Sequence, residues 1–401
     1  MLLQDRYIFG PMIDCRNILP PSLLLPAIAF SILSAANSLG LARAVETSEG
    51  ASERVVRQEP TAVDLSTLKG LSDVVERLAN KDIAYVGEVH DRFSHHQVQL
   101  QILEGLYRKH PKIAIGMEMF QRAFQKALDD YIAGLIDERV FLKRSEYFKR
   151  WDMDYNLYKP ILDFAKARGI PVIALNLQRE LVNKVGTSGL ESLSADEKSQ
   201  IPQELDFTDQ GYRARLEQVF KAHQNFQQKN FEFFHQAQIL WDETMAESVD
   251  RFLKKNPDSR MVVLAGAGHL QYGSGIPKRS FRRNGREYAI VLSDAEIQKG
   301  IADFIVFPVP AKPQTAPRLM IVLNEQNQTV RVTGFAKDSV AEKAGLEKDD
   351  TLLSLDGYPV DSIEDVKIAL FYKKSGETIR VKVRRSRLPT DEELEFEIRL
   401  P

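Results

Sequence analysis

Two short segments far apart in the chain have the same form: each places a histidine just after a glycine at the end of an apolar run. Gly87-Glu88-Val89-His90 follows the run 83–86, and Gly266-Ala267-Gly268-His269 follows the run 261–265. Both patterns are typical of a buried strand that ends where glycine allows a sharp turn. The carboxyl ends of strands in an α/β domain open onto the crevice where ligands bind. The sequence therefore predicts that both imidazoles face one site.

Further polar side chains lie at equivalent positions along the chain. Glu88 stands two residues before His90, so in extended backbone both side chains face the same side of the strand. Glu118 and Asn176 end or follow two other apolar runs. Any one of these residues alone is more typical of an ordinary structural contact, such as an ion pair between Glu118 and Arg122. Their joint placement at strand ends indicates a shared site.

Histidine and glutamate side chains suggest two kinds of chemistry at this site. They are ligands of zinc, manganese or iron, and a spare carboxylate can act as a general base on bound water. The candidate metal ligands for a divalent ion are therefore His90, Glu118 and His269. If the protein is a hydrolase, the candidate catalytic carboxylates are Glu88 and Glu118.

Two other segments lie within reach of the crevice. His96 belongs to a predicted amphipathic helix over 93–108, one or two turns beyond the first strand end, and is interpreted either as a ligand or as a residue that supports one. The segment 151–160 is rich in aromatic side chains. Its Tyr155 or Tyr158 would be able to offer a phenolate to ferric iron, as tyrosine does in some haem proteins. The alternative for both tyrosines is a packing role.

The elements that must position these residues follow from the apolar pattern. Runs rich in β-branched residues recur at 83–86, 112–117, 171–175, 261–265, 288–292 and 304–307. Helical patterns separate most of them, which predicts an α/β fold with a mainly parallel sheet covered on both faces. About 85 residues between the third and fourth runs lack a strand pattern and predict a helical insertion, whose last helix covers roughly 225–255.

Composition narrows the class of protein. The chain has 401 residues, of which 43% are hydrophobic and 27% charged, so it is globular and long enough for two domains. Its formal net charge of -2 provides no basic field of the kind that binds nucleic acid or anionic lipid. We therefore expect no nucleic-acid partner.

The amino-terminal region has the pattern of an export signal. Residues 1–44 combine early arginines with the apolar stretch 18–33 and the small residues Ala42-Arg43-Ala44, which predicts a cleaved signal peptide followed by a flexible leader over 45–65. Cys15 is the one cysteine and precedes the apolar stretch, where no lipobox can use it. The expectation is a periplasmic or secreted protein without disulfides or a lipid anchor.

A proline-rich linker over 311–317 separates the region 66–310 from a small α+β module over 318–401. In this module Ser339-Val340-Ala341-Glu342-Lys343-Ala344-Gly345-Leu346, followed by residues 349–357, resembles a PDZ domain. That resemblance implies that a peptide, usually a protein carboxyl terminus, adds as a strand beside the second helix. The loop that would bind the carboxylate falls at 317–320 and departs from the family pattern, since it contains no glycine.

Residues 66–310 are similar to the ChaN family of bacterial haem-binding proteins, in the haem-uptake and Tiki superfamily. The likeness rests on an ordered set of motifs: Tyr85-Val86-Gly87-Glu88-Val89-His90-Asp91 with His95, His96 and Gln99, Gly116-Met117-Glu118-Met119-Phe120, Trp151 with Tyr158-Lys159-Pro160, Trp241-Asp242-Glu243-Thr244-Met245-Ala246, and Gly266-Ala267-Gly268-His269. The resemblance implies an envelope protein of iron acquisition that holds haem at a contact between two copies, hence a homodimer. The candidate haem contacts are then His90, His96, Tyr155, Tyr158 and His269.

Three functions follow from these patterns. The leading hypothesis is an exported haem- or iron-binding protein of iron or haem uptake or handling, with a peptide-binding PDZ-like module. Tiki-like members of the superfamily imply the second, a metal-dependent hydrolase that acts on peptides. The third is an envelope scaffold that recruits a partner through the PDZ-like domain. Because ChaN proteins are typically lipoproteins, the missing lipobox cysteine departs from that family.

Overall fold

The computed structural model describes residues 63–151, 153–222, 230–387 and 390–401. The predicted signal peptide over 1–44, with Cys15, and most of the predicted leader lie outside the described residues. Within the described part of the chain, no helix has both the length and the apolar character needed to cross a membrane.

The first domain is built on one parallel sheet of six strands in the order β3-β2-β4-β1-β5-β6. Its strands are β1 (Ile83–Glu88), β2 (Ile113–Gln121), β3 (Val172–Asn176), β4 (Arg260–Gly266), β5 (Tyr288–Ser293) and β6 (Phe304–Val306). All six predicted strands are present, and the predicted mainly parallel α/β fold is confirmed. The largest boundary difference is in β2. This strand was expected to end at Glu118, but it continues through Glu118 to Gln121.

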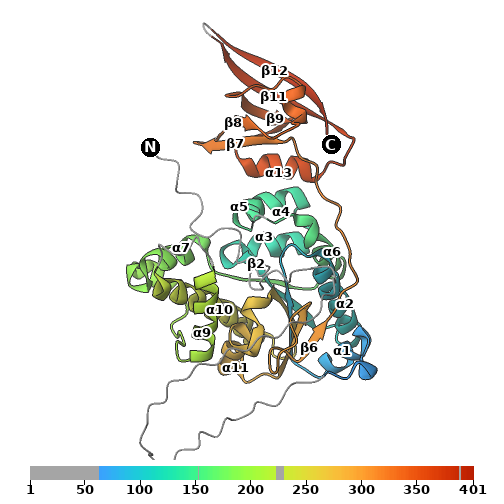
Figure 1. Ribbon diagram of the computed structural model, residues 1–401, viewed down its shortest axis with the longest axis vertical. Coiled ribbons are helices and arrows are strands. Elements are labelled where there is room, and N and C mark those ends of the chain that lie inside the picture. The colour runs from blue at the N-terminus through green and yellow to red at the C-terminus, as the bar shows by residue number, and fades with distance from the viewer. Residues whose placement is uncertain (1–62, 152, 223–229, 388–389) are drawn as a thin grey trace, which may run out of the picture.

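Successive side chains of each strand enter two different cores. Ala84 and Val86 of β1 pack into the core shared with α2 and α6, whereas Ile83 and Tyr85 pack against α10 and α11 on the other face. Helices lie on both sides of the sheet (Figure 1). The helices outside the insertion are α1 (Leu71–Leu78), α2 (Phe93–Lys109), α3 (Gln125–Ile132), α4 (Glu138–Arg144), α5 (Tyr147–Arg150), α6 (Lys159–Arg168) and α11 (Ile276–Asn284).

The predicted helical insertion follows β3. It consists of α7 (Arg179–Ser188), α8 (Ala195–Ser199), α9 (Gln210–Ala222) and α10 (Phe231–Lys255). The predicted long helix is α10, which begins after residues 223–229 that lie outside the described part. Met245 and Val249 of α10 pack in the core, as their helical spacing predicts. Trp241 of the same helix packs partly buried against this core, and its ring lies 5.5 Å from the ring of His269.

The second domain has a mainly antiparallel sheet in the order β12-β11-β9-β8-β7, with β10 paired to β9. Its elements are β7 (Ile321–Gln326), β8 (Thr329–Phe335), α12 (Val340–Lys343), β9 (Thr351–Leu355), β10 (Tyr358–Pro359), α13 (Ile363–Phe371), β11 (Thr378–Arg387) and β12 (Thr390–Arg399). The second helix of this domain is α13, and Ser362 caps it through a hydroxyl that accepts from the Asp365 N–H.

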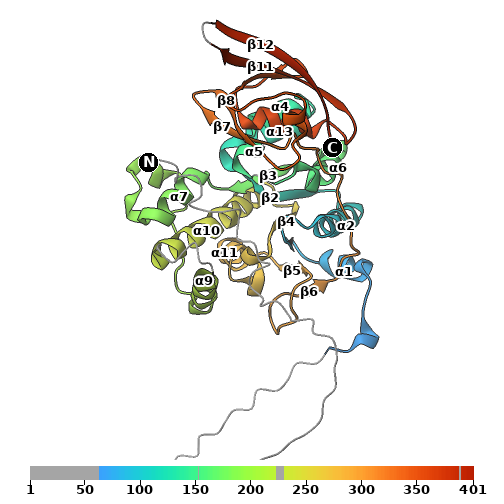
Figure 2. The same cartoon turned by 45° about the horizontal axis from the view of Figure 1, so that its top comes forward.

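Helix α13 also joins the two domains, because it packs against α4 and α5 of the first (Figure 2). The ring of Phe371 lies 5.3 Å from the ring of Tyr155, and Ile368 enters the first domain's core. At the edge of this contact, Lys143 Nζ lies 2.6 Å from Asp365 Oδ1. The PDZ-like domain therefore rests on the segment that carries the candidate tyrosines.

Candidate functional site

The first half of the site is built at the carboxyl end of β1. Glu88 is the last strand residue, and its carboxylate is fully buried. Its Oε1 lies 2.5 Å from His90 Nδ1, and its Oε2 lies 3.1 Å from His96 Nε2 of α2. Burial raises the pKa of Glu88, but the neighbouring imidazoles of His90 and His96 outweigh burial and lower it overall. Glu88 is therefore a buried carboxylate held between two imidazoles.

His90 is the ion-pair partner of Glu88. Burial lowers the pKa of its imidazole, but the Glu88 carboxylate outweighs burial and raises the pKa to about 9. At neutral pH His90 and Glu88 thus form a buried ion pair, with Nδ1 of His90 committed to the carboxylate. The Trp151 ring meets the His90 ring edge to face at 5.0 Å, which limits how far the imidazole can tilt.

The second half of the site comes from the opposite face of the sheet. Glu118 of β2 accepts the Gly266 N–H at Oε2, 2.7 Å away, and its Oε1 lies 3.4 Å from His269 Nε2. The other ring nitrogen of His269, Nδ1, lies 2.7 Å from Asp242 Oδ1 of α10. Burial lowers the pKa of His269, while Glu118 and Asp242 more than offset it and raise the pKa overall. His269 therefore stands between two carboxylates.

Gly266 is where the two halves meet. It ends β4, the strand between β1 and β2, and pairs with Glu88 in the β1–β4 register. A Cβ atom added at Gly266 would lie 2.8 Å from His90 Cε1 and 3.6 Å from Glu118 Oε2. The missing side chain is what lets His90 approach Glu118 across β4. Residues 88, 90, 118 and 269 thus converge on one place, as the strand-end pattern predicts.

Exposure differs sharply within this cluster. The carboxylates of Glu88, Glu118 and Asp242 have no solvent exposure, whereas the side chains of His90 and His269 are 13% and 12% exposed. The two imidazole edges are therefore the parts of the cluster that a ligand from solution meets first, with negative charge directly behind each ring.

His96 and Asn176 support the cluster from behind. Nδ1 of His96 lies 3.0 Å from Gln99 Oε1, and its Nε2 faces Glu88 and the His90 carbonyl, so both nitrogens are engaged with protein oxygens. The Asn176 amide donates to the Glu118 carbonyl and accepts from the Trp241 indole. Arg122 bonds to Glu247 and Ser248, so the simple Glu118–Arg122 pair does not form.

Neither candidate tyrosine reaches solvent. The Tyr158 hydroxyl lies 3.4 Å from Glu88 Oε1 and from the His90 carbonyl, and its ring packs edge-on to His96. Tyr155 is enclosed by aromatic rings that include Phe371. Burial raises the pKa of both phenols well above the usual range, so both stay protonated. Both tyrosines are packed in the interior, so a phenolate contact with iron would require this segment to open, and their role as haem contacts stays a prediction.

Asp242 and Tyr212 belong to the site although the sequence analysis assigned neither a role. Asp242 binds His269, and the Tyr212 hydroxyl donates to Asp242 Oδ2 over 2.7 Å. A sequence signal was present for Asp242: it is an acidic residue on the buried, apolar side of a long helix. No local pattern identifies Tyr212, since its partner is 30 residues away on another helix.

The arrangement brings carboxylates and imidazoles into contact with each other. Among the residues that the structure describes, no group of three or more histidine, cysteine, aspartate or glutamate side chains is arranged to hold a metal ion. The proposed ligand set His90, Glu118 and His269 stays a prediction. As described, the same groups are positioned to hold and move protons.

The fold and the site together define an α/β protein with a cluster of paired imidazoles and carboxylates at the carboxyl edge of its sheet, followed by a PDZ domain. A sequence model described as "Haem-binding uptake, Tiki superfamily, ChaN" matches residues 74–279, just over half of the chain, and a PDZ domain model matches residues 317–400. The chain belongs to this ChaN family, and its carboxyl-terminal part is a PDZ domain.

Two curated proteins and a solved structure illustrate what the chain is similar to. Protein RETICULATA-RELATED 5, chloroplastic, of Arabidopsis thaliana is 24% identical over 287 residues, which are 65% of this chain and 38% of that protein. A probable periplasmic serine endoprotease DegP-like of Chlamydia trachomatis is 24% identical over 142 residues, 33% of this chain and 27% of that protein. The chain therefore spans well under half of either relative.

The solved structure is one of cofacial heme binding to ChaN of Campylobacter jejuni. It is 17% identical, with a TM-score of 0.49, and the match covers 58% of this chain and 89% of that one.

Proposed function

We propose that this chain is an exported haem- or iron-binding protein that serves haem or iron uptake or handling, with the PDZ domain as its peptide-binding module. Membership of the ChaN family supports the haem assignment. The observation that carries it to particular residues is the convergence of His90 and His269, two partly exposed imidazoles backed by buried carboxylates. A carboxylate behind a histidine orients the ring and raises its basicity, as in many metal sites.

The residues present fit haem through nitrogen. His90 and His269 would hold the iron, while Tyr155, Tyr158 and His96 would support the walls of the crevice, because their polar atoms are buried or engaged. Bound haem would supply the iron centre, and the protein would supply the imidazole and the charge behind it. His90 carries a proton at neutral pH, so it must release that proton before its nitrogen binds a metal.

Hemin titration of the purified apo-protein tests the proposal. We expect a shift of the Soret band at micromolar hemin, weakened by His90→Ala or His269→Ala and retained in Tyr158→Phe. His110→Ala is the matched control, since His110 bonds to the Ala79 carbonyl away from the crevice. Absence of any Soret shift would refute haem binding. Loss of the shift in Tyr158→Phe alone would assign the iron to the tyrosine. Sedimentation with and without hemin tests for the homodimer.

A second candidate function, hydrolysis, is favoured by a specific observation. Each histidine has Nδ1 held by a carboxylate, at 2.5 Å for Glu88–His90 and 2.7 Å for Asp242–His269, and Glu118 lies beside both rings. Imidazoles oriented in this way can act as general acids or bases. Metal analysis of protein prepared without chelator, and a peptide-cleavage screen with His269→Ala as control, test this function. Equal cleavage by the variant would remove it.

The PDZ domain would bind a peptide at the β7 edge. β7 is the outer strand of its sheet and lies beside α13, the arrangement that strand addition uses. The carbonyl of Met320, in the loop before β7, accepts the Ala336 N–H. Peptide arrays that present the same sequences with free and with blocked carboxyl termini would show whether a terminal carboxylate is needed.

A further inference from the structure

We propose that Asp242 and Tyr212 are positioning residues of this site, which fix the ring orientation and the proton of His269 through a buried chain of hydrogen bonds. The inference rests on the proposed function only in taking His269 as a site residue. The helical insertion then forms part of the site, because Tyr212 lies on α9 and Asp242 on α10.

The chain of contacts runs in one direction. The Tyr212 hydroxyl donates to Asp242 Oδ2 over 2.7 Å, and Asp242 Oδ1 lies 2.7 Å from His269 Nδ1. Asp242 has no solvent exposure and Tyr212 only 4%. The Asp242 carboxylate can only accept hydrogen bonds, and the Tyr212 hydroxyl donates one of them. Nδ1 of His269 must therefore carry the proton that it shares with Asp242. The other nitrogen, Nε2, is then the one directed at Glu118 and the crevice.

The Asp242–His269 pair is closely packed. Gly275, just before α11, comes so close that an added Cβ would lie 2.1 Å from the His269 carbonyl oxygen and 3.0 Å from Asp242 Oδ1. The Trp241 ring meets the imidazole edge-on at 5.5 Å. A rotated His269 ring would lose its carboxylate partner.

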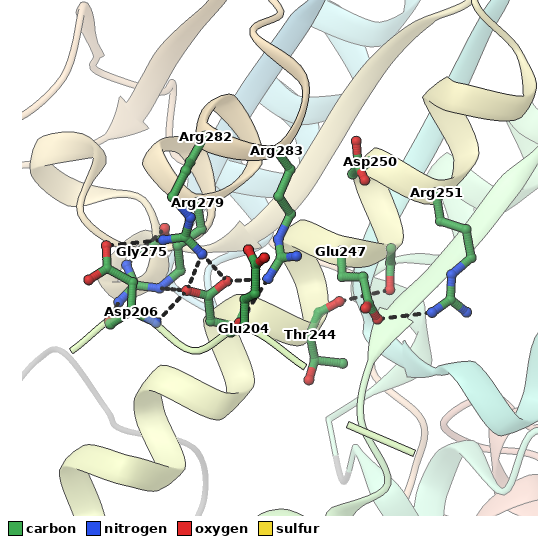
Figure 3. Close-up of polar contacts among 12 residues, drawn as sticks. Glu204, Asp206, Thr244, Glu247, Asp250, Arg251, Gly275, Arg279, Arg282 and Arg283 are labelled. Atoms are coloured by element: carbon green, nitrogen blue, oxygen red, sulfur yellow. Dashed lines mark hydrogen bonds and ion pairs between the residues drawn. The ribbon is translucent and has the colours of Figure 1, made fainter. Parts of the chain in front are cut away.

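A separate cluster of ion pairs between side chains holds the insertion in place and keeps Tyr212 against Asp242. Figure 3 shows Arg279 and Arg282 of α11 beside Asp206, in the loop before α9, and Arg283 beside Glu204. Glu243 is adjacent to Asp242 and fully buried. Its carboxylate oxygens lie 2.7 Å from Arg282 Nη2 and 2.5 Å from Arg283 Nη2. A buried carboxylate is stable only with such partners.

Two further contacts secure α9. Arg215 Nη2 donates to Ser274 Oγ over 2.6 Å, and Arg279 Nη2 donates to the Asp206 carbonyl over 3.1 Å. Both bonds tie the insertion to the segment that carries His269 and Gly275. The insertion therefore cannot move away from the crevice without breaking this cluster, which is expected of a fixed wall and not of a free lid.

Proton NMR of the full chain provides the test. An imidazole N–H bonded to a carboxylate gives a strongly downfield resonance because the hydrogen bond is charge-assisted. We expect one such resonance that disappears in His269→Ala, disappears in Asp242→Ala, and moves upfield in Asp242→Asn. In Tyr212→Phe it should remain but exchange faster with water, since the seal behind Asp242 is lost.

The matched control is Asp294→Ala. Asp294 makes another aspartate–histidine contact, 3.1 Å from His95 Nε2, and its removal should leave the His269 resonance unchanged. A His269 resonance that persists unshifted in folded Asp242→Asn protein would overturn the inference. If the resonance behaves as expected but His269→Ala leaves hemin affinity unchanged, the positioning role stands and the haem function at His269 fails.

Discussion

Replacing Gly266 with alanine would place a methyl group against the imidazole of His90. The added Cβ would lie 2.8 Å from Cε1 and 3.0 Å from Nε2 of that ring, closer than carbon atoms pack in proteins. The ring cannot simply withdraw, because Glu88 holds it at 2.5 Å and Trp151 meets its face. The backbone of Gly266, with φ -58° and ψ 139°, accepts alanine without strain, so the whole penalty arises from this contact.

The size of the effect follows from two opposing contributions. Overpacking a closed site costs about 1–3 kcal/mol. Replacing glycine with alanine at a permitted backbone conformation stabilises by about 0.4–1 kcal/mol, because the unfolded chain loses freedom. Overpacking is the larger contribution, and we expect Gly266→Ala to lower the free energy of unfolding by about 1 kcal/mol.

Gly268 provides a matched control two residues away in the same motif. An added Cβ at Gly268 would meet nothing within 4 Å, and its φ is not positive. Gly268→Ala should therefore leave stability unchanged or raise it by about 0.4–1 kcal/mol. The two variants are expected to move in opposite directions, although they make the same chemical change.

Urea unfolding followed by tryptophan fluorescence measures this difference in the relevant domain. The chain has two tryptophans, and Trp151 and Trp241 lie against His90 and His269, so the signal excludes the PDZ domain. Hemin affinity should fall in Gly266→Ala and not in Gly268→Ala. If Gly266→Ala proves as stable as Gly268→Ala, the close approach of His90 across β4 is wrong, and with it the shared site.

Three further outcomes are expected. The pKa of His90 rises from 6.5 to about 9 on folding. The stability that its ion pair with Glu88 adds is therefore complete below pH 6.5 and is lost as pH rises through 9. In His90→Gln, the free energy of unfolding measured in urea should depend less on pH between 6.5 and 9. Glu364 lies in the first turn of α13, where burial and the nearby carboxylates of Glu146 and Asp365 outweigh Lys143 and Lys149 and raise its pKa from 4.5 to about 7. Domain docking should therefore weaken from pH 4.5 through 7, and Glu364→Gln should remove this trend in proteolysis of the linker 311–317. Lys143→Ala, which breaks a partly exposed pair with Asp365, should cost only about 0.2–1 kcal/mol of domain docking in the same assay, and a larger loss would mean that this pair carries the interface.

Local patterns were enough to predict the strands and the ends of several elements. The run 83–86 became β1 because a short apolar, β-branched segment between polar turns has few other ways to bury itself. Helix α13 begins after Ser362, whose capping box is visible in the sequence. The strand β2 was predicted too short, because Glu118 was interpreted as its end. In the fold, the Gly266 N–H donates to that carboxylate and the His269 imidazole lies 3.4 Å from it, so the charge does not interrupt the strand.

The identity of the chemical groups is written in the amino-acid sequence: two Gly-x-x-His segments, their carboxylates and the order of motifs that marks the ChaN family and the PDZ domain. Their connections depend on contacts between distant residues. Only the folded chain buries Tyr158 behind Glu88, joins Tyr212 to His269 through Asp242, and closes the space over Gly266. Strand and helix patterns reflect neighbours along the chain, whereas burial and hydrogen bonding at this crevice arise where the two faces of the sheet meet at its carboxyl edge.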